Sequence, residues 1–241
     1  MVLAVYCPRK SDGARHLVLT LRGLGVEAIL ARNPEDLTKL INRDRVVVWG
    51  EPLHGTLKVP TLNAKAPLGS KVRELKAFLA AKIPHPEFQE RPPANLKGWH
   101  SRAFHHQAGK DLLGKVPGGD YFTRHVDTVH EFRVHVFQGH GFRVGVKRPD
   151  PERKVHPFVR THRAGWYLSY RLADLDAAGP RGRAIHAAVK AVKAVGYDFG
   201  AVDVGITVKG NPVVFEVNSA PGLEGGTIER YARLIAEWAR N

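Results

Sequence analysis

Three oxygen-bearing side chains near the C-terminal end of the sequence have a spacing that could hold a metal ion. Asp203 lies in an alternating run at 201–207, and Glu216 and Asn218 lie in a second alternating run at 213–218. Such alternation is typical of half-buried strands, whose successive side chains point to opposite faces. Carboxylate and amide oxygens are ligands that suit Mg²⁺. The pattern suggests a magnesium site, with an edge hairpin whose polar face meets water as the alternative.

The turn between the two runs determines which residues face each other. Residues 209–212, KGNP, have the composition of a turn. The register that follows places Asp203 opposite Asn218 and Gly205 opposite Glu216. Cross-strand neighbours lie about 5 Å apart and diagonal ones about 7–8 Å apart. We therefore expect the three oxygen-bearing side chains to share one face of one hairpin.

The segment that contains the second run resembles a known family. Residues 215–225, FEVNSAPGLEG, resemble the C-terminal signature of the ATP-grasp superfamily, most closely its branch of ribosomal-protein glutamate ligases and small phage-type proteins. A second block, EFRVHVF at 131–137, also matches, and the resemblance covers roughly residues 65–241. It implies an α+β ATP-grasp fold, with two α+β lobes that enclose ATP, preceded by a small α/β parallel-sheet domain.

The resemblance also implies what the hairpin binds. Asp203, Glu216 and Asn218 match the family residues that hold Mg²⁺. They are the same three residues that the alternation places on one face. We therefore expect them to bind Mg²⁺, with Mn²⁺ as an alternative ion, against the phosphates of ATP.

Cationic residues and a loop are implied to contact the same phosphates. Family members place a cation on a strand of the smaller lobe, and Arg102 is favoured over Lys97 because the phage-type branch uses arginine. The next stretch, 105–119, corresponds to a flexible lid, although it is poorer in glycine than the family pattern. A basic pair follows the second matching block. The expected nucleotide contacts are Arg102, Lys97, Gly109, Lys110, Lys147 and Arg148.

Three further residues are implied to act on the substrate. Arg133 lies on the polar face of the block at 131–137, where the family supports the transferred phosphoryl group or a substrate carboxylate. A surface ion pair with Glu131 is the alternative for this arginine. Arg160 and His162, in the segment RTHRAGW, match a segment of the phage-type branch in which Asn often stands where this sequence has Thr.

The implied reaction is ATP-dependent ligation. A substrate carboxylate attacks the γ-phosphorus of ATP, and an amine then displaces phosphate from the acyl phosphate to form an amide or peptide bond. The expected partners are ATP, the carboxylate, and an amine acceptor that is a small molecule, a peptide or a nucleic-acid-linked group. Two alternatives keep the ATP site: a kinase-like ATP-grasp phosphotransferase, and a basic protein that binds or modifies nucleic acid.

Composition limits the class of protein. The 241 residues include 37 Lys and Arg against 23 Asp and Glu, a formal net charge of +14 at pH 7. Such a charge attracts polyanions, so a phosphate-rich active site and a nucleic-acid surface both agree with it, as does charge kept for solubility alone. A single cysteine, the lack of a long apolar run and the lack of a signal-peptide pattern lead us to expect a cytoplasmic protein with no membrane segment.

Strands and helices must bring these residues together. Alternating strand and helix signals over about the first fifty residues predict a parallel sheet in an N-terminal domain at 1–66. The ATP-grasp domain is expected at 67–241, with its smaller, ATP-covering lobe at about 87–127. Helices are predicted from Ser11, from Pro34 to about Ile41, from Ser70 to about Lys82, from Pro180 to Val195, and from a cap at Thr227.

One of these helices begins beside a lysine of interest. Val72, Leu75, Phe78 and Leu79 form the expected buried face of the helix from Ser70. Lys71 resembles a lysine that is common in the family. A solvated helix lysine is nevertheless the interpretation that we favour.

Overall fold

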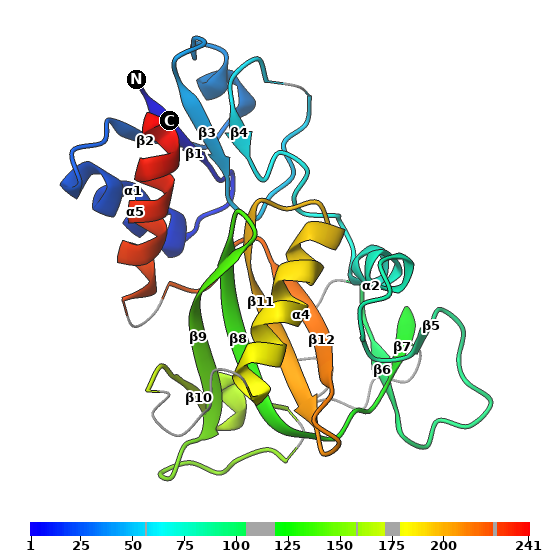
Figure 1. The fold of residues 1–241 in the computed structure, drawn as a ribbon. Helices are drawn as coiled ribbons and strands as arrows, with labels where there is room; N and C mark the ends of the chain where they lie inside the picture. Colours follow the sequence, from blue (N-terminus) through cyan, green and yellow to red (C-terminus); the bar gives the residue numbers. More distant parts are fainter. Residues whose placement is uncertain (56, 105–118, 158, 172–178, 224–225) are drawn as a thin grey trace.

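The chain folds around a parallel sheet, a long antiparallel sheet and a small antiparallel sheet (Figure 1). This mixed content confirms the predicted α+β class. None of the helices in the described ranges has the length and apolarity that crossing a membrane requires. The computed structural model describes residues 1–55, 57–104, 119–157, 159–171, 179–223 and 226–241.

The N-terminal sheet is parallel, with the strand order β2-β1-β3-β4. Its strands are β1 (Leu3–Tyr6), β2 (Ala28–Ala31), β3 (Arg45–Val48) and β4 (Thr61–Leu62). Helix α1 (Asp12–Gly23) begins as predicted at Ser11, whose side chain accepts a hydrogen bond from the Ala14 amide. The predicted parallel sheet and the first of its two predicted helices are therefore confirmed.

The second predicted helix of this region is wrong in type and length. Residues 34–37 form only the short 3₁₀ helix η1 (Pro34–Leu37). The Asp44 carboxylate accepts hydrogen bonds from the amides of Ile41, at 2.9 Å, and Val2, at 2.7 Å. These bonds hold the chain in a turn before β3, so the helix does not continue to Ile41.

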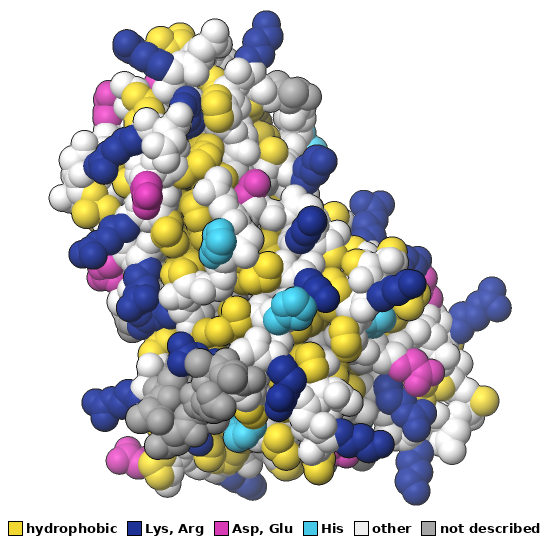
Figure 2. Space-filling model, in the orientation of Figure 1, with side chains coloured by type: hydrophobic (Ala, Val, Ile, Leu, Met, Phe, Trp, Pro, Cys, Tyr) yellow, Lys and Arg dark blue, Asp and Glu magenta, His cyan; other side chains and the backbone are white. Residues whose placement is uncertain are grey.

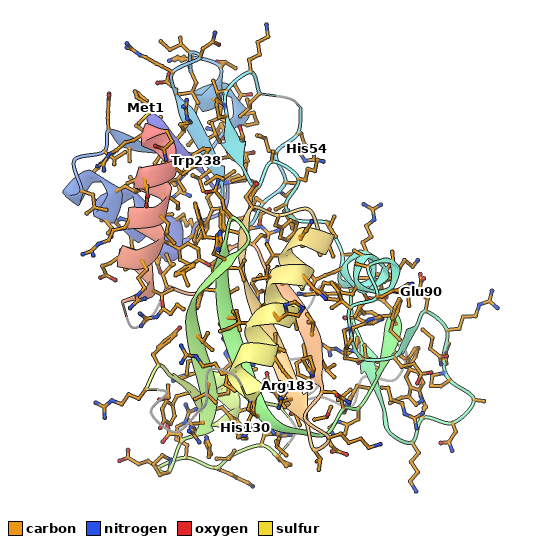
Figure 3. The ribbon with its side chains drawn as sticks, in the orientation of Figure 1. Met1, His54, Glu90, His130, Arg183 and Trp238 are labelled. Carbon is orange, nitrogen blue, oxygen red and sulfur yellow. The ribbon has the colours of Figure 1, made fainter. Side chains whose placement is uncertain are left out.

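A helix from the far end of the sequence completes the N-terminal core. Helix α5 (Thr227–Arg240) packs against α1 (Figure 1). Its Tyr231 and Ile235 are fully buried beside Trp49, and Trp238 (Figure 3) packs at the edge of the same cluster. Thr227 is the first helical residue and is itself buried, and Gly226, with φ of 76°, occupies the capping position that was predicted for Thr227.

The long sheet is antiparallel, with the strand order β10-β9-β8-β11-β12. Its strands are β8 (Thr128–Phe137), β9 (His140–Pro149), β10 (Trp166–Ser169), β11 (Phe199–Thr207) and β12 (Pro212–Asn218). Helix α4 (Pro180–Ala194), the predicted helix, covers one face (Figure 1). Val134, Val202 and Val204 point to α4 and form the apolar core there. The polar residues that alternate with them must therefore point to the opposite face.

The register of the β11–β12 hairpin differs from the predicted one by two residues at Asp203 and by three beyond it. Asp203 pairs with Glu216, and Asn218 pairs with Ala201. The turn is longer than expected, because the last pair is Ile206 with Pro212. A bulge between Asp203 and Val204 leaves Phe215 as an extra residue, which breaks the alternation predicted for this strand.

The small sheet lies beside helix α2 (Lys71–Ala80) and has the strand order β5-β7-β6 (Figure 1). Its strands are β5 (Phe88–Gln89), β6 (Trp99–Arg102) and β7 (Tyr121–Arg124). Helix α2 begins at Ser70, as predicted, and buries Leu75 and Phe78. Leu79 is 60% exposed, because it follows Phe78 by about 100° around the helix and so faces water. The expected domain boundary and lobe limits stay predictions.

Candidate functional site

A cavity of about 190 Å³ lies among the polar face of the long sheet, helix α2 and the small sheet. Its apolar lining includes Leu75, Pro86, Tyr121, Val126 and Phe215. Its charged lining consists of Lys71, Arg102, Arg124, Glu131, Lys147, Arg160, Asp203 and Glu216.

Asp203 is the most heavily paired carboxylate of the site. The Arg133 guanidinium donates two parallel hydrogen bonds, Nε to Oδ1 at 2.7 Å and Nη2 to Oδ2 at 2.9 Å. The Lys147 ammonium adds a third, to Oδ2 at 3.0 Å. Burial alone would raise the pKa of Asp203, but Arg133 and Lys147 hold that pKa well below its ordinary value. Asp203 is therefore a fixed negative charge at the cavity wall.

Lys147 and Arg160 extend this network along the sheet. Lys147 also donates to the Glu131 carboxylate, so one ammonium joins two carboxylates. Arg160 Nη2 donates to the Thr128 carbonyl at 2.6 Å, and its Nε lies 3.9 Å from Glu131 Oε2. The Arg160 guanidinium also lies over the Trp166 ring, 4.8 Å from its centroid. These contacts fix the orientation of Arg160 at the edge of the cavity.

Glu216 is paired with helix α2 and with a residue of its own strand. The Lys71 ammonium lies 2.9 Å from Glu216 Oε2, and Asn218 Nδ2 donates to Glu216 Oε1 at 2.8 Å. The interpretation of Lys71 as a solvated lysine is wrong, since its side chain is only 23% exposed and points into the site. Packing of α2 over β12 causes this placement, which helix periodicity alone does not show.

Glu74 is a site residue that sequence reasoning missed. One turn after Lys71, its Oε2 lies 3.6 Å from the Lys71 ammonium, and its Oε1 accepts a hydrogen bond from the Val217 amide at 2.7 Å. Burial, with the nearby Glu216 charge, raises the pKa of Glu74 to about 7 despite Lys71. The available signal was a glutamate on the buried face of an amphipathic helix, between Val72 and Leu75.

No protein-family model and no curated protein sequence matches the chain. Comparison with solved structures, however, identifies the fold in which this site lies. A D-alanine–D-alanine ligase from Bacillus anthracis matches 99% of this chain over 97% of its own, with 15% identity and a TM-score of 0.68. The ATP-grasp ligase PsnB, complexed with a minimal precursor, Mg and ADP, matches 99% of this chain over 98% of its own, with 14% identity and a TM-score of 0.66. The chain has the ATP-grasp fold.

A third solved structure with this fold also matches this chain over nearly its whole length. The macrocyclase MdnC from Microcystis aeruginosa MRC, bound with the precursor peptide MdnA, matches 100% of this chain over 99% of its own, with 12% identity and a TM-score of 0.62. The fold predicted from the FEVNSAPGLEG segment is therefore confirmed. The structural similarity also extends over the N-terminal residues that the resemblance did not cover.

The ATP-grasp fold brings together only some of the predicted site residues. Arg102 lines the cavity from β6, and Lys147 lines it from β9. Arg133 lies behind Asp203 and is not part of the cavity lining. Lys97 is exposed in the loop before β6, and His162 is exposed on the 3₁₀ helix η2 (His162–Ala164).

The remaining predicted residues cannot be placed at the cavity. Arg148 is half-buried on β9 and does not line it. The lid expected at 105–119, with Gly109 and Lys110, lies outside the described residues except for Gly119. The roles of Arg148, Gly109, Lys110, Lys97 and His162 stay predictions.

The small sheet adds histidines that sequence reasoning did not place in the site. His100 Nε2 lies 3.0 Å from His125 Nδ1, and His125 Nε2 lies 3.0 Å from Asp127 Oδ1. Both imidazoles line the cavity. This chain of contacts fixes the orientations of the two rings.

The donors available to a metal ion are oxygens. Asp203 and Glu216 are register partners and both line the cavity, and Asn218 contacts Glu216. Within the described ranges no group of three His, Cys, Asp or Glu side chains could hold a metal ion by itself. Two carboxylates and an amide suit Mg²⁺, which keeps several waters and shares phosphate oxygens with its substrate. The residues therefore fit this ion when a phosphate accompanies it.

A buried histidine on the polar face predicts how stability depends on pH. Burial, with the charges of Arg133 and Arg143, lowers the pKa of His135 to about 3, and its ring contacts the hydroxyls of Tyr231 and Tyr170. The unfolded chain takes up a proton near the ordinary pKa of about 6.5, whereas the folded state does not until about pH 3. The free energy of unfolding should therefore fall as pH drops through this window, by on the order of 4 kcal/mol from His135.

Urea unfolding at several pH values between 6.5 and 4 checks this expectation. His135→Gln should flatten the dependence on pH, whereas His16→Gln, at an exposed position of α1, should leave it unchanged. Equal slopes for wild type and His135→Gln would show that His135 does not cause the loss.

Proposed function

We propose that the protein is an ATP-dependent carboxylate–amine ligase that forms an amide or peptide bond through an acyl phosphate. The observation that carries this proposal is the pairing of Asp203 with Glu216 at the wall of a cation-rich cavity, within an ATP-grasp fold. The neighbours' names support the class of reaction, since they include a D-alanine–D-alanine ligase and a ligase and a macrocyclase bound to precursor peptides.

The cavity fits a nucleotide triphosphate with its metal. Among the described residues, five lining cations (Lys71, Arg102, Arg124, Lys147 and Arg160) face three lining carboxylates (Glu131, Asp203 and Glu216), an excess of two positive charges. A triphosphate with one Mg²⁺ leaves a net negative charge, which this excess offsets. Tyr121 and Phe215 supply apolar surface for a flat base.

Asp203, Glu216 and Asn218 would hold Mg²⁺ in this complex. When bound, Mg²⁺ neutralises phosphate oxygens and orients the γ-phosphate. The chain's own cations serve the same end: Arg133 fixes the Asp203 carboxylate, and Lys71 fixes Glu216. Both carboxylates are thus held ready before substrates arrive, which lowers the reorganisation that the reaction needs.

The proposed reaction has two displacements. A substrate carboxylate oxygen attacks the γ-phosphorus and ADP leaves, which gives an acyl phosphate. An amine nitrogen then attacks the acyl carbon, phosphate leaves, and the nitrogen loses a proton. Lys147 and Arg160, buried beside Glu131, offset the charge that gathers as carboxylate and triphosphate approach. A carboxylate acceptor from an amino acid or a peptide fits this chemistry.

A kinase-like phosphotransferase is the alternative, and one isotope experiment separates the two. We expect phosphate release from Mg·ATP to depend on both a carboxylate and an amine, in a screen of amino acids and peptides. With ¹⁸O in the substrate carboxylate, label should appear in the released phosphate, because that oxygen bridges carbon and phosphorus in the acyl phosphate. Label that stays wholly in the product, or a phosphorylated hydroxyl found by mass analysis, would favour the phosphotransferase.

A further inference from the structure

The outer surface of α4 is wholly basic at its exposed positions. The helix has 15 residues, PRGRAIHAAVKAVKA, and none is acidic. All of its exposed side chains are basic, and we call them the α4 stripe: Arg183, His186, Lys190 and Lys193. Their spacing of three, four and three residues places them along one side of the helix. Figure 2 shows blue and cyan side chains over α4 on this face and no magenta.

Lysines beyond both ends of α4 continue the stripe. A Cβ atom at Gly196, just after the helix, would lie 3.9 Å from Cδ of the exposed Lys65. At the other end, a Cβ atom at Gly210 would lie 3.3 Å from Nη2 of Arg183, whose side chain is labelled in Figure 3. The exposed Lys209 precedes Gly210 in the β11–β12 turn. The basic surface therefore extends past the helix at each end.

The charges of the α4 stripe are not balanced within the part of the chain that the structure describes. No ion pair there involves Arg183, Lys190 or Lys193. Lysines three residues apart on a helix repel each other, which costs a few tenths of a kcal/mol per pair. Such an arrangement gains free energy from an external polyanion, because binding replaces the repulsion with attraction.

We propose that the α4 stripe binds the phosphate backbone of nucleic acid without reading its bases. Lysine is depleted and aromatic residues are enriched in protein–protein interfaces, and the α4 stripe has lysines and no aromatic residue. Arg183 and Lys193 are ten residues apart, or about 15 Å along the helix axis. A duplex carries one phosphate per about 1.7 Å of axis, so the stripe can face several phosphates at once.

This surface is separate from the cavity. Helix α4 packs on the apolar face of the long sheet, whereas Asp203 and Lys147 lie on the opposite face. Nucleic acid on the α4 stripe would leave the cavity accessible. The proposal therefore goes beyond the proposed ligase activity and does not depend on it.

Salt-dependent binding tests the proposal. The probes are a fluorescein-labelled 25-base-pair DNA duplex of random sequence and its RNA counterpart, followed by anisotropy between 50 and 200 mM KCl. The triple variant Arg183→Gln/Lys190→Gln/Lys193→Gln should bind at least tenfold more weakly at 50 mM KCl than the wild type. Its slope of log K against log salt should be less steep by about 2 to 3, because each lost phosphate contact contributes about 0.9.

A control variant removes the same charge elsewhere. Lys39→Gln/Lys58→Gln/Arg240→Gln changes three exposed cations away from α4 and should bind nearly as the wild type does. Equal weakening of both variants would overturn the proposal, since net charge alone would then explain binding, and so would absence of wild-type binding at 50 mM KCl. Stronger displacement of the labelled duplex by poly-L-glutamate than by unlabelled duplex at equal charge concentration would also overturn it, in favour of an acidic protein surface. Circular dichroism should show that both variants fold.

Discussion

Replacing Glu216 by glutamine should reduce Mg·ATP-dependent phosphate release by about 10²–10³-fold while the protein stays folded. Glu216 is one of two carboxylates that face each other across β11 and β12. Burial alone would raise the pKa of Glu216, but Lys71 and Asn218 hold that pKa below its ordinary value, so the carboxylate stays charged. Glutamine keeps the size and the contact with Asn218 but loses the charge that would hold Mg²⁺. Initial rates of phosphate release over a Mg²⁺ titration measure the effect.

A carboxylate that pairs with the same helix supplies the control. Glu90 (Figure 3) also pairs with a lysine of α2, with 2.7 Å between Glu90 Oε1 and Lys76 Nζ, but about half of each side chain is exposed. Glu90→Gln should therefore retain wild-type rates, since exposed pairs of this kind contribute little. Wild-type activity in a folded Glu216→Gln protein would remove Glu216 from the proposed metal site.

Replacing Arg133 by lysine should impair turnover although the positive charge is kept. Arg133 fits Asp203 through two parallel hydrogen bonds, a geometry that the single ammonium of lysine cannot reproduce. We expect the Mg²⁺ concentration at half-maximal rate to rise about tenfold, because Asp203 would lose its fixed orientation. Arg133→Ala should go further and cost about 3–5 kcal/mol of stability, since it leaves a buried carboxylate with Lys147 as its main partner.

The same experiment separates two roles for Arg133. If Arg133 positions Asp203, the Mg²⁺ dependence changes and the KM for the carboxylate substrate stays nearly constant. If Arg133 binds the substrate carboxylate, as the resemblance implies, the KM rises and the Mg²⁺ dependence does not. Arg153→Lys is the matched control, because Arg153 is exposed and does not line the cavity. Comparable defects in both variants would argue against either specific role.

The residues of the hairpin could be predicted from sequence, but their pairing could not. Alternation in 201–207 and 213–218 correctly placed Asp203 and Glu216 on one face, because strand geometry dictates that property locally. Pairing depends on the length of the turn and on the bulge beside Asp203, and the turn composition of KGNP determines neither. The predicted pairing of Asp203 with Asn218 was therefore wrong, although Asp203 and Glu216 do share one face.

Contacts between helices and strands that are distant in the sequence could not be predicted from local patterns. Lys71 looked like a surface residue because it starts a helix, and only the packing of α2 over β12 brings it to Glu216. His125 meets His100 across the small sheet, a register of β6 and β7 that short strands specify weakly. Strand alternation and the family motif led to Asp203, Glu216 and Asn218, whereas these neighbours depend on how the elements pack.

The packing of α5 against the N-terminal sheet has a consequence for the order in which the protein is made. Residues 1–62 leave the ribosome before α5 does, so Leu17 and Trp49 keep an uncovered apolar surface until Tyr231 and Ile235 of α5 emerge. The N-terminal sheet is thus synthesised well before α5, the helix that completes its apolar core. A partly made chain therefore exposes this apolar surface throughout the synthesis of the long sheet, and exposed apolar surface of this kind favours aggregation.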